Sequence, residues 1–189
     1  MPLLTNILLG VLGGQLLTRA VYDHIWYPFF FNTDPTSLKA KVTASQRQES
    51  LNFYRHIAHQ PAAFNYVVYG ATFLILLSLV GQTVVAARNR ASNLLALVSF
   101  SSAVGIYITL VSPLINSFAA ARGPHRMKAD AEARSLSDLA FWQACVAAAW
   151  FVTLILQTGV SENEEAAAAR ISSSSSSSNA KKVAAGKKE

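Results

Sequence analysis

Two histidines, His56 and His59, stand three residues apart in the segment FYRHIAHQP, and this spacing can place both imidazoles on one face of a helix. Two such imidazoles can act as metal ligands, but zinc needs three or four ligands. Asp23, His24 and His125 are the other plausible ligands, and no regular spacing links them to the pair. We therefore predict that His56 and His59 are polar residues at a membrane interface, and that the chain uses no metal or other cofactor.

The remaining reactive side chains form no recognisable catalytic arrangement. No serine, cysteine or carboxylate pair occurs in the sequence context of a nucleophile or of a general acid and base. The single cysteine, Cys145, lies within an apolar block and excludes an intramolecular disulfide. We therefore predict that the protein is not an enzyme. Two alternatives stay open: a scaffold subunit of a membrane complex, and a small four-span membrane oxygenase that uses Asp23, His24, His56 and His59.

Four long apolar blocks must position these residues. Of the 189 residues, 52% are hydrophobic and only 14% are charged, whereas soluble domains carry about 25% charged residues. A bilayer core roughly 30 Å thick is spanned by about 20 apolar helical residues, and a chain this short cannot bury several helices that are apolar on all sides. We predict an all-α membrane protein whose domain, residues 1–160, is a bundle of four transmembrane helices at about 3–21, 62–87, 92–119 and 138–160.

The charges lie mainly in the connections between these blocks. The net charge is +6, and the basic residues flank the apolar blocks, where they anchor membrane proteins against lipid headgroups, so they do not indicate nucleic-acid binding. A count of the basic residues near the membrane does not favour cytosolic termini and leans slightly the other way. The apolar blocks of spans two, three and four, at 62–87, 91–121 and 139–161, contain no charged residue, which disfavours a pump or a coupled transporter.

The polar segment between the first two spans is predicted to contain a loop helix. Pro35, Thr36 and Ser37 are suited to begin a helix, and Pro61 fits the first turn of the second span. The apolar positions between them are compatible with an amphipathic helix that lies on the membrane or leads into that span: Leu38, Val42, Leu51, Tyr54 and Ala58.

Three further features predict interruptions or ends of helices. The third apolar block is longer than the bilayer requires, and Pro113 is the expected place for a bend. Ser137 is suited to cap the fourth span, with Asp138 favourable at the positive end of that helix. Residues 161–189 hold an acidic cluster, a serine run at 172–178 and four lysines, so we predict a disordered tail.

Small residues at helical spacing mark candidate packing faces. Gly10 and Gly14 form a small-x-x-x-small pair in the first span. The alanines at 140, 144 and 148 repeat every four residues in the fourth span, and the third span holds a stretch of small residues at 99–105. These faces suit either client helices or packing within the bundle itself; the candidate residues are Ala140, Ala144, Ala148, Ser101 and Gly105.

Four segments of the chain carry a resemblance to a known family. They are FFFNTD after the first span, LNFYRHIAHQPAAFNYVVYGATFLILLSLVG in the second, AVGIYITLVSPLINSF in the third and LAFWQACVAAAWFVTLILQTGV in the fourth. Together they resemble the fungal endoplasmic-reticulum membrane chaperones that package amino-acid permeases, the Shr-type family. The likeness covers residues 3–164 by order and spacing, and it is most specific at residues 51–81.

The resemblance implies a location and a function. Members of that family reside in the endoplasmic-reticulum membrane with four spans, cytosolic termini, and the first and third loops in the lumen. They bind new amino-acid permeases transiently, prevent their aggregation and promote their exit in transport vesicles. The resemblance therefore implies a chaperone without enzymatic activity. The tail lies outside the resemblance and is the segment expected to meet components of the COPII coat. The charge count is nearly even, so the orientation with cytosolic termini follows the resemblance.

Overall fold

The computed structural model describes residues 2–29, 42–85, 89–120 and 129–185, and it describes the backbone alone for residues 2, 29, 129, 161 and 163–185. Every element in these ranges is helical: α1 (Pro2–Asp23), the 3-10 helix η1 (His24–Phe29), α3 (Ala44–Ala58), α4 (Ala62–Val85), α5 (Arg90–Ile106), the π-helical turn η2 (Tyr107–Val111), α6 (Ser112–Ala120) and α7 (Ala129–Ala185). Four helical stretches are long and apolar enough to cross a membrane. The prediction of an all-α, four-span membrane protein is confirmed.

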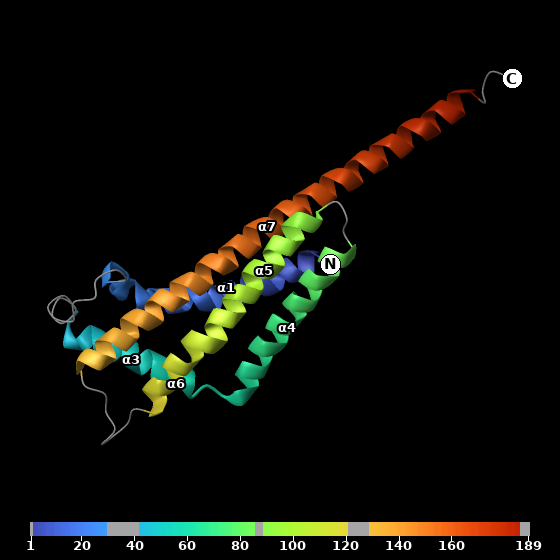
Figure 1. The fold of residues 1–189 in the computed structure, drawn as a ribbon. Coiled ribbons are helices and arrows are strands. Elements are labelled where there is room, and N and C mark those ends of the chain that lie inside the picture. Colours follow the sequence, from blue (N-terminus) through green and yellow to red (C-terminus); the bar gives the residue numbers. More distant parts are fainter. Residues whose placement is uncertain (1, 30–41, 86–88, 121–128, 186–189) are drawn as a thin grey trace.

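The four spans run side by side in a bundle with two distinct ends (Figure 1). One end, called here the tail end, carries the N-terminus, the close of α4 and the start of α5, and α7 extends beyond it. The opposite end, called here the α3 end, carries η1, α3, the close of α6 and the start of α7. The chain therefore begins at the same end of the bundle from which α7 projects.

The first three spans begin and end close to the predicted positions. The third span is interrupted just before Pro113, where the backbone N–H of Ser112 donates to the carbonyl of Tyr107, five residues earlier. Proline has no N–H, so in an ordinary α-helix the carbonyl of Thr109 would lack its donor at Pro113. The wider π-type turn is one way in which a helix adjusts to such a gap.

The fourth span begins earlier than predicted and ends at Val160 as predicted, while the helix that contains it, α7, continues further. α7 begins by Ala129, so Ser137 is a buried residue inside the helix and does not cap it. Asp130 and Glu132 occupy the first turn, where negative charge is favourable. Residues 161–185, which were predicted to belong to a disordered tail, continue the helical backbone of α7 to Ala185. No proline follows Gly159 and the segment is rich in alanine, so a helix already formed in the span can propagate into it.

The loop helix α3 lies against the bundle. Thr43 and Gln46 form a capping box that begins it, while the proposed start at Pro35, Thr36 and Ser37 lies outside the described residues. Three of the predicted apolar positions are buried, namely Val42, Leu51 and Tyr54. They join the core formed with α6 and α7, which is why the helix is held at the end of the bundle. α3 ends just before Pro61, and α4 begins directly after it, as expected.

Polar side chains link all four spans at the tail end. The hydroxyls of Thr5 and Ser78 lie 2.6 Å apart, and Gln82 Nε2 donates to both of them. Asn93 Nδ2 donates to the carbonyl of Gln82 at 3.2 Å, and Gln157 Nε2 donates to Asn93 Oδ1 at 3.3 Å. Hydrogen bonds of this kind stabilise helix association by roughly 1 kcal/mol each. This network holds the tail end together where α1, α4, α5 and α7 converge.

Candidate functional site

The alanine repeat of α7 does not form one uniform surface. Ala140 is fully buried in the core, Ala144 is half-buried, and Ala148 is exposed. The stripe turns from the inside of the bundle to the outside because a step of four residues advances about 40° beyond one full turn of 3.6 residues. Ala140 therefore serves packing within the bundle, and only the end of the repeat at Ala148 is available to another molecule.

The small residues of α5 and η2 form an outward surface, which we call the α5 outer face and define as Ser101, Ser102, Gly105 and Thr109. All four residues are exposed, and a side chain at Gly105 would meet nothing within 4 Å. The hydroxyl of Ser102 donates to the carbonyl of Val98, and that of Thr109 donates to the carbonyl of Gly105, both at 2.8 Å. These hydroxyls are thus satisfied in an apolar surrounding and are still close to any helix that packs on the face.

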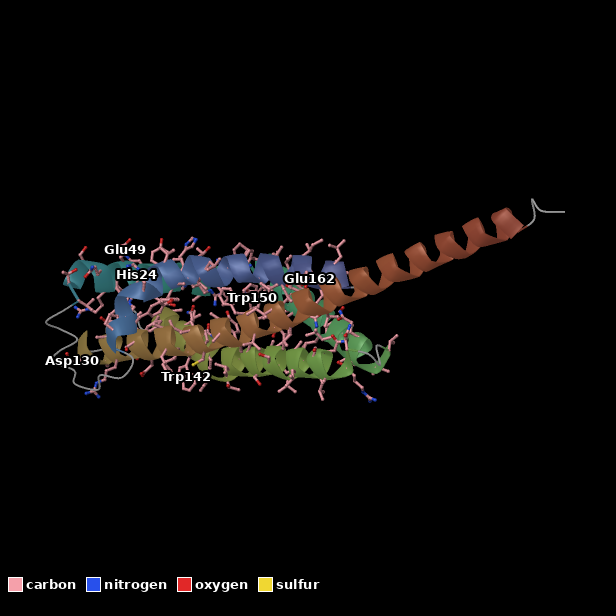
Figure 2. All side chains as sticks on the ribbon, turned by 90° about the horizontal axis from the view of Figure 1, so that it is seen from above. His24, Glu49, Asp130, Trp142, Trp150 and Glu162 are labelled. Atoms are coloured by element: carbon pink, nitrogen blue, oxygen red, sulfur yellow. The ribbon has the colours of Figure 1, made fainter. Side chains whose placement is uncertain are left out.

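A second outward surface of small residues lies on α1. Gly10 and Gly14 are exposed, with no neighbouring atom within 4 Å of a built Cβ. Thr18 continues this row and donates its hydroxyl to the carbonyl of Gly14. Gly13 differs, because a Cβ there would lie 2.3 Å from two ring carbons of Trp150. Figure 2 shows Trp150 between α1 and α7.

The tightest internal contact, between α5 and α7, was not predicted. Ser99 donates its hydroxyl to the carbonyl of Ala149 at 2.8 Å, and the hydroxyl of Thr153 lies 3.5 Å from the carbonyl of Ala96. Side-chain bonds to the backbone of the neighbouring helix require that the two helices approach closely, which the small residues allow. The sequence signal was the small stretch at 99–105, but only some of its members face inward.

A buried polar cluster joins α3 to the spans, and we call it the α3 junction. The phenol of Tyr54 donates to Oδ1 of Asp23, and Gln143 Nε2 donates to the phenol oxygen at 3.2 Å. Asp23 and Tyr54 are almost completely buried. Burial, followed by the nearby Asp23 carboxylate, raises the pKa of Tyr54 well above its ordinary value, so the phenol keeps its proton and remains a donor. The junction ties the end of α1 to α3 and α7.

The sequence interpretation treated Tyr54 only as an apolar position and thus missed this junction. The available signal was Asp23, a carboxylate at the end of an apolar span and four residues after Arg19. A carboxylate at this depth needs a hydrogen-bond donor. The donor comes from another helix 31 residues away, which no local pattern specifies.

The two histidines lie on the outer side of α3, near its end. Both are exposed, and Nδ1 of His59 is 2.7 Å from the carbonyl of Arg55. Within the described ranges there is no group of three or more histidine, cysteine or acidic side chains placed to hold a metal. His125 lies outside those ranges. The structure therefore assigns the pair no ligand, and its function stays open.

Comparison with known proteins adds no identification. No family model matches the chain, and no curated protein or solved structure is detectably similar to it. The class that the fold defines is a multi-pass α-helical membrane protein.

Proposed function

We propose that this protein is a chaperone of the endoplasmic-reticulum membrane that assists the folding of amino-acid permeases and promotes their exit in transport vesicles. The resemblance at residues 51–81 supplies the family and the client. The observation that best supports a chaperone function is the α5 outer face, a row of small and weakly polar side chains turned away from the bundle. An unassembled permease span exposes small and polar positions that need a temporary partner of this kind.

The chemistry of the face suits a partner that binds and then leaves. Small side chains allow close backbone approach, while interhelical hydrogen bonds in membranes contribute only about 0.6–2 kcal/mol each. Such contacts are lost readily when the permease forms its own internal contacts. In the proposed arrangement both termini are cytosolic, α3 is lumenal, and the α7 extension is the segment that reaches COPII components.

Leucine at Gly105 is expected to block the α5 outer face without harming the fold. The new side chain has open space around it, so the protein level should not change. Amino-acid permease recovered with the chaperone should fall about ten-fold, equivalent to about 1.4 kcal/mol of binding. Gly81→Leu is the matched control, because Gly81 is an exposed glycine on α4 that also has nothing within 4 Å. Equal recovery from both variants would remove the α5 outer face as the client surface.

Deletion of the gene tests the proposed function as a whole. Fluorescent amino-acid permeases should then accumulate in the endoplasmic reticulum, whereas an unrelated multi-pass membrane protein should still reach the plasma membrane. Normal delivery of the permeases in the deletion strain would refute the proposal. Retention of both cargoes would instead indicate a general trafficking defect.

A further inference from the structure

A pocket opens between α1, α4, α5, η2 and α7. The arrangement of these helices is shown in Figure 1. Its volume is about 120 Å³, and its walls are mostly apolar, with Leu16, Val104 and Val146 among them. A cavity of roughly 150 Å³ accommodates a benzene molecule. The pocket therefore suits several methylene groups of one acyl chain, and is too small for a whole lipid or a helix.

One wall of this apolar pocket carries a guanidinium. Arg19 lines the pocket together with Tyr107, and both of its Nη atoms lie 3.2 Å from the hydroxyl of Tyr107. Arginine has five N–H donors, and no other described residue accepts a hydrogen bond from this one. The carboxylate of Asp23 interacts electrostatically with Arg19 and accepts its hydrogen bond from the hydroxyl of Tyr54. Arg19 therefore keeps donors for a further acceptor.

The position of Arg19 along α1 is compatible with a lipid headgroup. Tyr27, which is exposed, follows it by about two helical turns, and tyrosine side chains collect at the level of the headgroups. Leu12 lines the deeper part of the pocket, about 10 Å from Arg19 along the helix axis. The cation thus lies toward the membrane surface and the apolar walls lie toward the membrane centre.

The deeper wall also contains an unused donor. Trp150 lines the pocket and is almost fully buried. Its indole N–H has no hydrogen-bond partner in the described part of the chain. The methylene groups of an acyl chain carry no acceptor, so this N–H does not contribute to the binding of such a chain.

From these observations we infer that the pocket binds one acyl chain of an anionic phospholipid, whose phosphate pairs with Arg19. Guanidinium and phosphate form short, charge-assisted hydrogen bonds in a paired geometry. A net negative headgroup is preferred over a zwitterionic one because its charge is not cancelled by a neighbouring choline. The site is independent of the proposed function, since it needs neither a permease nor the α5 outer face.

Photolabelling in defined vesicles tests this site. The full-length protein is placed in phosphatidylcholine vesicles that contain a small fraction of phosphatidylserine or phosphatidylcholine with a diazirine in the acyl chain, and labelled peptides are then mapped. We expect labels on residues 12–19 and 68–72, with a preference for phosphatidylserine of about five-fold, the typical effect of one basic residue near an anionic surface. Arg19→Gln should abolish the preference.

Two tryptophan variants separate pocket binding from general contact with lipid. Thr72→Trp fills the pocket from α4 and should remove these labels, whereas Thr18→Trp, on the exposed side of α1, should leave them unchanged. Equal labelling of the wild-type protein by the two lipids would overturn the proposal, as would labels spread over all lipid-facing helices. Preferential labelling by a free diazirine fatty acid, with none by phosphatidylserine, would also overturn it. The comparison of the two lipids uses only the wild-type protein, so its result does not depend on whether any variant folds.

Discussion

Replacement of Gly13 by leucine is expected to disrupt the bundle more than any other single change in the first span. Even a methyl group at this position would lie 2.3 Å from Cζ2 and Cη2 of Trp150. The indole is almost fully buried and belongs to the core formed by α1, α4, α5 and α7. It therefore cannot move aside without loss of packing in this core. Overpacking of this kind costs about 1–3 kcal/mol of stability. The side chain of leucine has a larger volume than the methyl group considered above. We therefore expect a loss of about 3 kcal/mol or more.

The measurement is thermal unfolding of the protein in detergent, in which the folded fraction that remains after heating is monitored by size-exclusion chromatography. Gly10→Leu and Gly14→Leu are the matched controls, because both glycines are on the same helix and neither has an atom within 4 Å of a built Cβ. They should keep the stability of the wild-type protein. If all three leucine variants unfold at the same temperature, the contact between Gly13 and Trp150 does not determine the packing of α1 against α7.

Removal of the Tyr54 hydroxyl is expected to have the second largest effect. Tyr54→Phe leaves a buried carboxylate at Asp23 without its donor and Gln143 Nε2 without its acceptor. A hydrogen bond to a charged group contributes about 1.5–3 kcal/mol, and the group left behind keeps its desolvation penalty. We expect a loss of about 2–3 kcal/mol, with α3 released before the spans separate, because the α3 junction joins it to α1 and α7.

A double-mutant cycle distinguishes the pair from two separate effects. Asp23→Leu removes the carboxylate, and the double variant Tyr54→Phe, Asp23→Leu removes both partners. The double variant should be more stable than the sum of the single changes predicts, by about 1–2 kcal/mol. Unfolding is measured by tryptophan fluorescence, since Trp26 is buried beside α3 and its indole lies 3.4 Å from Ser50 Oγ. Tyr66→Phe, at an exposed position, is the control; strictly additive effects would contradict the coupling.

Sequence reasoning was reliable for the spans because it used local properties. The length and hydropathy of an apolar block decide whether it crosses a bilayer, and the four predicted spans correspond to the four observed ones. The position of Pro61 likewise predicted where α3 stops and α4 begins. The tail was predicted to be disordered from its composition alone, whereas its backbone continues the helix that begins in the fourth span. A helix that is already nucleated propagates more readily than one that must begin alone.

The candidate faces were harder to predict for a physical reason. A membrane helix is apolar on all sides, so its sequence lacks the polar stripe that marks the outer face of a soluble helix. Gly13 and Gly14 are neighbouring residues of the same type. Trp150 fills the space where a side chain at Gly13 would lie, whereas the space at Gly14 is open. Ala140 and Ala148 likewise belong to one repeat, but one is buried in the core and the other is exposed.

The sequence by itself determined that this protein is an all-α membrane protein with four spans and a polar loop helix, because these features follow from the local length, hydropathy and turn residues of the chain. Only the tertiary structure decided which small residues face outward, that His56 and His59 lie apart from any cluster of described metal ligands, and that Tyr54 reaches Asp23. Those outcomes depend on how far each helix is rotated against its neighbours. That rotation is set by contacts between distant residues, which no single segment contains.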